Sequence, residues 1–116
     1  INIMKYEKHL SEPWYSLIKL GIKTCEGRLN KGDFSKMNVG DIITFENSDF
    51  GFERKFNVQV ISIHNYKTFS DYLRAETLKK TLPGITKVED GLKIYYKYYK
   101  KEDEAKYNIR ALRLQI

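Results

Sequence analysis

The sequence predicts an α+β protein built on a small mixed or antiparallel β-barrel with helices around it. Several segments alternate apolar and polar residues, which is the period of a half-buried strand. Other segments repeat apolar residues at the spacing of an amphipathic helix. The connections between the expected strands are short, except for one helical block before the last strand. We therefore expect one strand, one helix, three strands, two helices and a final strand, in that order.

Five segments are expected to be strands because they alternate in polarity or are rich in β-branched residues: 4–6, 23–29, 42–46, 55–63 and 107–116. In the fourth segment Phe56, Val58 and Val60 share one face, after which the apolar positions shift by one to Ile61 and Ile63. One extra residue in a strand swaps its faces, so this shift predicts a β-bulge near Val60. The alternative is a strand end that is buried on both sides.

Three segments are expected to be helices because apolar residues recur at helical spacing: 14–20, 69–80 and 88–99. Pro13 suits the start of the first helix, and Gly21 suits its end because glycine accepts the left-handed conformation found there. Thr86 and Glu89 have the spacing of a capping box, which places the start of the third helix beside them. Residues 30–38 show neither period and are expected to form a polar loop.

The chain of 116 residues is expected to form one domain, residues 1–116. Lysine and arginine number 21 against 15 aspartate and glutamate residues, which gives a formal net charge of +6. This balance indicates an acidic partner, of which nucleic acid is the commonest, although a solvated surface would also explain it. No apolar run approaches the ~18 residues of a membrane span, so we expect no membrane association. We expect a monomer.

Cysteine and histidine are scarce, with one cysteine and two histidines in the sequence. This leaves no disulfide within the sequence and argues against a metal cluster, so we expect no metal and no cofactor. The low cysteine content favours a reducing, cytoplasmic location. We interpret Cys25 as a small strand residue that faces the core rather than as a nucleophile, because a catalytic thiol needs a neighbouring base.

The densest group of charges follows the first expected helix, at residues 21–28 (GIKTCEGR). Because side chains alternate along a strand, Thr24, Glu26 and Arg28 share one face, opposite a face of small and apolar residues. Lys23 lies at the junction and can reach either side. The polar face is expected to line a cleft or to meet water. In the alternative, Glu26 and Arg28 form only a surface ion pair, which contributes at most about 1 kcal/mol.

The third expected helix and its end alternate four tyrosines with four lysines: Tyr95, Tyr96, Tyr98, Tyr99, Lys93, Lys97, Lys100 and Lys101. A core stripe beside a solvated lysine face explains this pattern. The alternative is an interaction surface, because exposed aromatic rings beside basic residues can stack on unpaired bases or dock a protein partner. A protein-interaction module is therefore a further candidate function.

These features together resemble the ASCH domain, a relative of the PUA RNA-binding fold. Residues 21–28 match the family pattern G-x-K-T-x-E-x-R, and residues 39–45 (VGDIITF) are similar to its G-D-x-I-x-F strand entry. Residues 69–76 resemble the helix that packs beside the family's cleft. Leu82-Pro83-Gly84 and the helix after it resemble a branch with a longer helical insert. The likeness covers almost the whole chain.

The resemblance implies a PUA-like mixed β-barrel of five or six strands, flanked by about three helices with a basic cleft between barrel and helices. It implies RNA or nucleotide binding, linked to RNA processing or transcription coactivation. One bacterial branch of the family hydrolyses the acetamide of N4-acetylcytidine with a lysine, a threonine and a glutamate. Lys23 matches that lysine, the threonine position is Glu26 in this sequence, and the glutamate falls near Glu76.

Two functions are therefore weighed at Lys23, Thr24, Glu26 and Arg28. In a binding site, Lys23 and Arg28 contact a phosphate or a base edge, and Glu26 orients one of them. In a small hydrolase that acts on a modified nucleoside or on RNA, Glu26 is the general base and Lys23 stabilises the oxyanion, with Glu76 in support. We expect RNA or a nucleotide as the partner, and a protein partner as the alternative.

Overall fold

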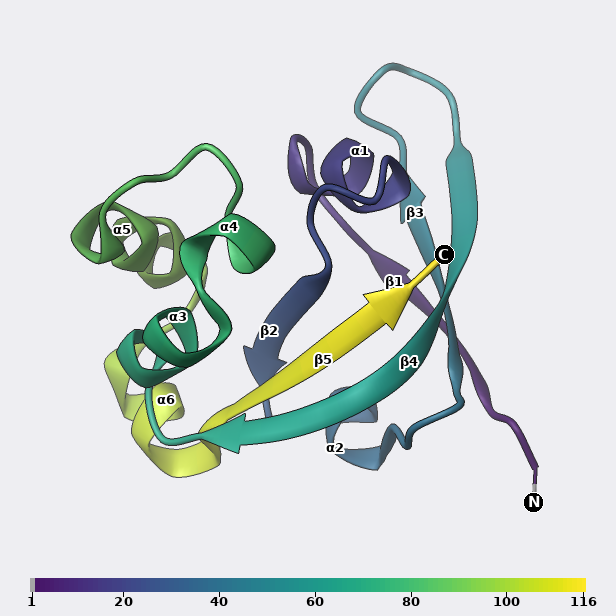
Figure 1. The fold of residues 1–116 in the computed structure, drawn as a ribbon. Helices are drawn as coiled ribbons and strands as arrows, with labels where there is room; N and C mark the ends of the chain where they lie inside the picture. Colours follow the sequence, from purple (N-terminus) through teal and green to yellow (C-terminus); the bar gives the residue numbers. More distant parts are fainter. Residues whose placement is uncertain (1) are drawn as a thin grey trace.

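Five strands form one curled sheet in the computed structural model, which describes residues 2–116 (Figure 1). The strands are β1 (Lys5–His9), β2 (Cys25–Leu29), β3 (Ile42–Asn47), β4 (Arg54–Tyr66) and β5 (Ile109–Gln115). Their order across the sheet is β1-β3-β4-β5-β2. β1 runs parallel to β3, and all other neighbours are antiparallel. The sheet is a half-barrel with β1 and β2 at its edges, so the predicted α+β fold on a mixed sheet is confirmed.

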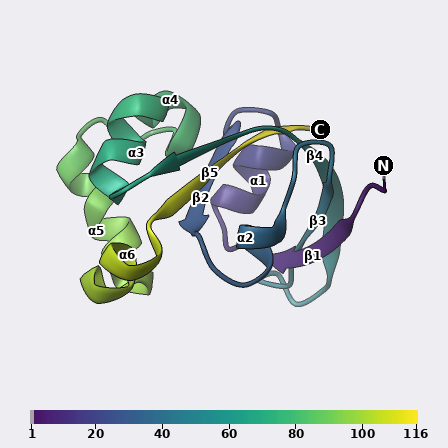
Figure 2. The same ribbon diagram turned by 90° about the horizontal axis from the view of Figure 1, so that it is seen from below.

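Six helices accompany the sheet over residues 2–116. They are α1 (Trp14–Lys19), α2 (Asp33–Lys36), α3 (Phe69–Glu76), α4 (Leu78–Thr81), α5 (Val88–Tyr98) and α6 (Lys101–Tyr107). The helices α3 to α6 follow one another between β4 and β5 and gather at one end of the sheet, whereas α1 and α2 lie nearer the other strands (Figure 2). In the described range, no helix is long and apolar enough to cross a membrane.

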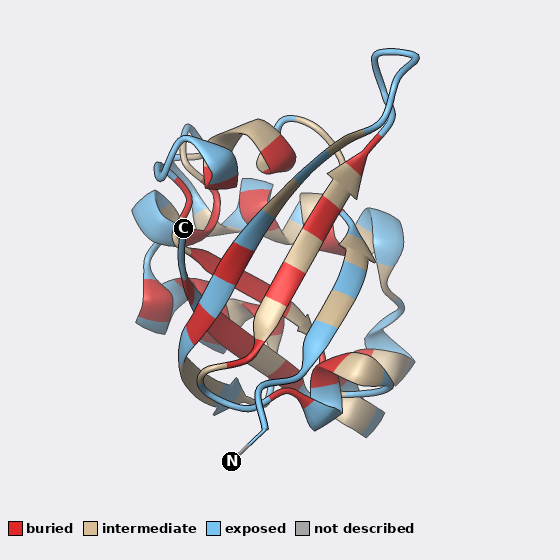
Figure 3. Ribbon diagram, turned by 90° about the vertical axis from the view of Figure 1, so that its right-hand side faces the viewer, coloured by how far each residue is buried: buried red, intermediate tan, exposed pale blue. Residues whose placement is uncertain are grey.

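The predicted bulge in β4 is confirmed. The pairing of β4 with β5 shifts register between Val60 and Ser62, and Ile61 is left 46 % exposed. Before the shift, Val58 and Val60 are buried while Gln59 is exposed, and Figure 3 shows this alternation of buried and exposed residues along the strands. A bulge increases the local bend and twist of a strand, so it helps this strand of 13 residues to curl from one core to the next.

Two apolar clusters hold the fold together. The first lies between α1 and the strands β3 and β4, where Tyr15, Ile18 and Phe45 are fully buried. The second joins the helical block to β2 and β5 and includes the fully buried Phe69. Trp14 packs against both clusters. The start of α1 therefore marks the seam between the half-barrel and the helical block.

The single helix predicted over residues 69–80 is wrong, because the structure has two helices there. Thr77 interrupts them with a left-handed backbone conformation (φ 75°), and α4 follows directly. A β-branched residue rarely adopts this conformation, so the sequence carries no signal for the break. At the other end of α3, the hydroxyl of Thr68 caps the helix by accepting a hydrogen bond from the N–H of Asp71 at 3.0 Å.

Two local predictions from polar residues are also wrong. Residues 30–38 are not simply a loop, since they contain α2, which is anchored by the buried side chain of Phe34. Thr86 and Glu89 do not form a capping box, because α5 begins after Lys87 and no side chain caps it. For α2, the burial of Phe34, rather than the local pattern, sets the position of the element.

The final strand begins at Ile109 and not at Tyr107, because the preceding residues form α6. The charged sequence of α6 hides an internal anchor. Glu104 is buried, and its carboxylate accepts hydrogen bonds from the backbone N–H of Phe69 at 2.7 Å and from the hydroxyl of Tyr96 at 2.9 Å. These contacts tie α6 to the start of α3 and to the end of α5. Sequence periodicity does not report them.

Candidate functional site

A cavity of about 250 Å³ opens between the edge strand β2, the start of α1 and α5. We call it the aromatic cavity, and its lining residues are His9, Leu10, Ser11, Trp14, Lys23, Glu26, Gly27, Arg28, Leu82, Ile94, Tyr95, Tyr98 and Tyr99. Most of this lining is aromatic or aliphatic, with a few charged groups contributed by β2 and its approach. Such a composition is typical of sites for small organic ligands. Because β2 is an edge strand, one of its sides is free of a neighbouring strand.

Glu26 is buried in this cavity between two cations. One carboxylate oxygen is 3.2 Å from Nζ of Lys23, and the other is 3.1 Å from both Nε and Nη2 of Arg28. Burial raises the pKa of Glu26, but Lys23 and Arg28 outweigh burial and hold the pKa below its usual value. The carboxylate is therefore ionised and takes up a proton reluctantly. It is suited to orienting the two cations and poorly suited to acting as a general base.

Protein acceptors already surround the ammonium group of Lys23. Its side chain is 1 % exposed, and besides its ion pair with Glu26 it donates hydrogen bonds to the backbone carbonyls of Cys25, at 2.7 Å, and of Thr81. An ammonium group has three N–H donors, and these three acceptors account for them. Lys23 therefore ties α4 to β2 and fixes Glu26. The break at Thr77 gives α4 the course that makes this contact possible.

Arg28 is the more accessible cation of the site, with a side chain that is 21 % exposed. Its Nη2 also donates a hydrogen bond to the carbonyl of His9 at 3.2 Å. Its guanidinium carbon lies 4.9 Å from the centre of the Phe34 ring, within the range of a cation–π contact. These contacts and the pair with Glu26 do not use Nη1. Arg28 is therefore held in place while keeping donors for a ligand.

Aromatic side chains from two elements form the walls of the cavity. Trp14 comes from α1, and Tyr95 and Tyr98 come from α5. The ring of Tyr95 is fixed by stacking on Phe69, with ring centroids 4.5 Å apart. Tyr98 is 68 % exposed and lies at the mouth. The tyrosine-rich helix thus provides a packed stripe, as one of its two interpretations predicts, together with one exposed ring at the cavity.

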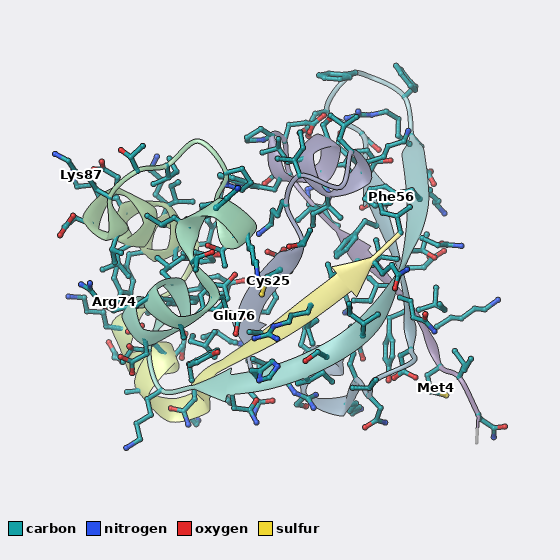
Figure 4. The ribbon with its side chains drawn as sticks, viewed as in Figure 1. Met4, Cys25, Phe56, Arg74, Glu76 and Lys87 are labelled. Carbon is teal, nitrogen blue, oxygen red and sulfur yellow. The ribbon has the colours of Figure 1, made fainter. Side chains whose placement is uncertain are left out.

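The structure places the other two predicted site residues elsewhere. Thr24 precedes β2, donates its backbone N–H to the carbonyl of Lys80 at 3.1 Å, and lines a separate hollow beside the end of β5. Glu76 approaches β2 from the side of Cys25, whose sulfur is 3.6 Å from its carboxylate (Figure 4). Neighbouring side chains of a strand point to opposite faces, so Glu76 lies across β2 from the carboxylate of Glu26.

Glu76 belongs to a second polar cluster. Its carboxylate accepts hydrogen bonds from Nε of Arg113, at 2.9 Å, and from the hydroxyl of Tyr66. Burial raises the pKa of Glu76, but the hydrogen bonds from Arg113 and Tyr66 overcome it and lower the pKa to about 2. Burial also raises the pKa of Cys25 to about 12, so its thiol stays protonated. The buried position of Cys25 confirms its interpretation as a core residue.

The arrangement brings together Lys23, Glu26 and Arg28 as the sequence predicts, and it adds Trp14 and Tyr98 to them. Trp14 has the spacing of any apolar helix residue, so no signal marks it as a wall of the cavity. For Tyr98, the alternation of lysine and tyrosine is the available signal. Within residues 2–116, no group of three or more acidic, histidine or cysteine side chains is placed to hold a metal ion.

A curled five-stranded half-barrel with helices packed at its side is a PUA-like fold. The family model for the ASCH domain matches residues 9–115. The crystal structure of hypothetical protein PH0355 from Pyrococcus is similar, with a TM-score of 0.87 and 36 % identity over 97 % of this chain and 98 % of that chain. The solution NMR structure of protein PF0455 from Pyrococcus furiosus gives a TM-score of 0.78 and 34 % identity over 97 % and 96 % of the two chains.

A search of the curated proteins finds no match. The family match spans nearly all of the sequence, and the two solved structures share the fold and are 36 % and 34 % identical to this chain. The chain therefore belongs to the ASCH domain family, whose members are generally RNA-binding. The family resemblance seen in the sequence is confirmed.

Proposed function

We propose that this protein binds an unpaired RNA base, or a single nucleotide, in the aromatic cavity. The observation that carries the proposal is a cavity with aromatic walls that holds a buried, ionised Glu26 paired with the partly exposed Arg28. Its volume of about 250 Å³ lies just below the roughly 300–1,000 Å³ of pockets for drug-sized ligands, which favours one base or nucleoside as the occupant. The net charge of +6 and the RNA association of the family favour the same class of ligand.

The lining residues divide into two roles. The rings of Trp14 and Tyr98 offer surfaces on which a base can stack, a mode that proteins use to hold single-stranded RNA. Arg28 supplies planar N–H donors for a base edge or a phosphate. Glu26 and Lys23 act as positioning residues, because the first holds Arg28 and the second holds Glu26. This division assigns direct contact to Arg28 and a supporting role to Lys23.

Trp14 provides a direct test, because it is the only tryptophan of the sequence. Titration with single-stranded RNA should quench its fluorescence as a base enters the cavity. Tyr98→Ala should weaken the binding roughly 5- to 150-fold, which corresponds to the ~1–3 kcal/mol that one stacked base contributes. Phe50→Ala is the matched control, since Phe50 is 63 % exposed and does not line the cavity.

The outcome separates the cavity from the rest of the surface. The proposal predicts unchanged affinity in Phe50→Ala and a clear loss in Tyr98→Ala, with the circular dichroism spectra of both variants like that of the wild type. Equal losses in the two variants would show that exposed aromatic rings bind RNA without regard to the cavity. RNA binding that leaves the fluorescence of Trp14 unchanged would place the ligand elsewhere.

A further inference from the structure

A second hollow adjoins the aromatic cavity. Arg28 and Tyr99 line both, so they form the wall between the two. The second hollow has a volume of about 300 Å³ and lies where the end of β2, the following turn and α2 meet β1. We call it the basic hollow, and its other lining residues are Lys8, Leu29, Lys31, Gly32, Asp33 and Phe34. Apart from Tyr99 and Phe34, it lacks the aromatic walls of its neighbour.

The charge of the basic hollow is positive. It holds the cations of Lys8, Arg28 and Lys31 and the carboxylate of Asp33. Nζ of Lys8 is 2.6 Å from the carboxylate of Asp33, so these two charges offset each other. Within residues 2–116, Lys31 forms no ion pair, and its Nζ lies 5.2 Å from the centre of the Tyr107 ring. Lys31 and the accessible side of Arg28 therefore give the basic hollow its net positive charge.

The two adjoining hollows differ in the chemistry that they suit. One is aromatic and fits a base, and the other is cationic and fits an anion. In a nucleotide a base and a phosphate are linked through one sugar. Arg28 stands at the shared wall, where a guanidinium can donate hydrogen bonds to groups on either side.

We infer that the basic hollow holds the phosphate next to the base that occupies the aromatic cavity, so that the preferred ligand is a nucleotide or an RNA strand rather than a free nucleoside. This inference rests on the proposed function. Lys31 supplies the unpaired positive charge for that phosphate, and Arg28 joins the two halves of the site. The volume of the basic hollow also leaves room for the start of the next nucleotide of the strand.

The test compares ligands that differ by one phosphate. The fluorescence of Trp14 is followed during titration with each of the four common ribonucleosides and with its 5′- and 3′-monophosphate. The wild type is compared with Lys31→Ala and with Lys19→Ala. Lys31 and Lys19 are both exposed, and Lys19 lines neither hollow, so the two variants lose the same charge at different places.

We expect one of the two monophosphates to bind the wild type roughly tenfold more tightly than its nucleoside, the gain typical of a hydrogen bond to a charged group. The monophosphate that binds more tightly identifies the direction in which the strand passes Arg28. Lys31→Ala should lose most of this gain, should flatten the salt dependence of the log affinity by roughly 0.7, and should bind nucleosides as the wild type does. Lys19→Ala should behave as the wild type.

Three results would overturn the inference while leaving the proposed function intact. The first is equal affinity of the wild type for nucleosides and for both monophosphates. The second is a phosphate gain that Lys31→Ala and Lys19→Ala retain equally. The third is displacement of the nucleotide by an oligoaspartate peptide at a concentration equal to that of the nucleotide, since the hollow would then accept any anion. Failure of every nucleoside and nucleotide to bind would overturn the proposed function as well.

Discussion

The ionised carboxylate of Glu76 should make the stability of this protein fall at acid pH. Burial raises the pKa of Glu76, but hydrogen bonds from Arg113 and Tyr66 lower it from 4.5 to about 2. At 1.36 kcal/mol for each pH unit, the gap between these values corresponds to about 3 kcal/mol of folding stability. The side chain of Arg113 is 45 % exposed, so water screens part of the interaction. We therefore expect a contribution of about 2–3 kcal/mol.

The direction in which stability changes with pH follows from the pKa of Glu76, which is lower in the folded state than in the unfolded chain. The folded state binds the proton of Glu76 less readily than the unfolded chain, so the contribution is complete above about pH 5 and is lost as the pH falls through 4.5 towards 2. Glu76→Gln keeps the shape of the side chain and removes its charge. The variant should be less stable than the wild type at neutral pH by about 2–3 kcal/mol, and the gap should close in acid.

Urea unfolding of the wild type and Glu76→Gln, from about pH 7 down to about pH 2, measures this gap. Glu102→Gln serves as the control, because Glu102 is exposed and forms no ion pair within residues 2–116. The control should follow the wild type at every pH. A difference between the wild type and Glu76→Gln that stays constant across the whole range would refute the reasoning, since it would show that the charge of Glu76 is not what stabilises the fold.

Three shorter predictions concern β2 and the lysine that precedes it. Gly27→Ala should lower the free energy of unfolding by about 1–3 kcal/mol, because a Cβ there would lie 2.4 Å from Cζ of Tyr72; equal midpoints in urea would show that the ring moves aside freely. Lys23→Met should lower the free energy of unfolding by about 3 kcal/mol or more, because it leaves Glu26 buried with one cation fewer. A fully stable variant that loses only salt-dependent RNA affinity would instead make Lys23 a phosphate contact. The wild type should release no acetate from N4-acetylcytidine, because Glu26 is held ionised between two cations; acetate release that disappears in Glu26→Gln would establish the hydrolase alternative.

The strands and the bulge were predictable because their signals are local. Alternation in polarity and β-branched content locate all five strands of the sheet, and the shift of apolar positions after Val60 marks the register shift in β4. The helical block was predicted less well. One break comes from the left-handed conformation of Thr77, and α6 is anchored by the buried Glu104, which binds the backbone of Phe69, 35 residues away in the sequence. Local periodicity reports neither the conformation of Thr77 nor the bond between Glu104 and Phe69.

The sequence by itself determined that Glu26 and Arg28 share one face of a strand, because the period of a strand is fixed by backbone geometry. It also determined the family, through a pattern that lies on that strand. Only the tertiary structure decided which elements cover each face. It placed the carbonyl of Thr81 against the ammonium of Lys23, and it placed Glu76 on the opposite side of the strand. The physical reason is that side-chain packing between distant segments, and not local periodicity, selects the partners of a buried charge.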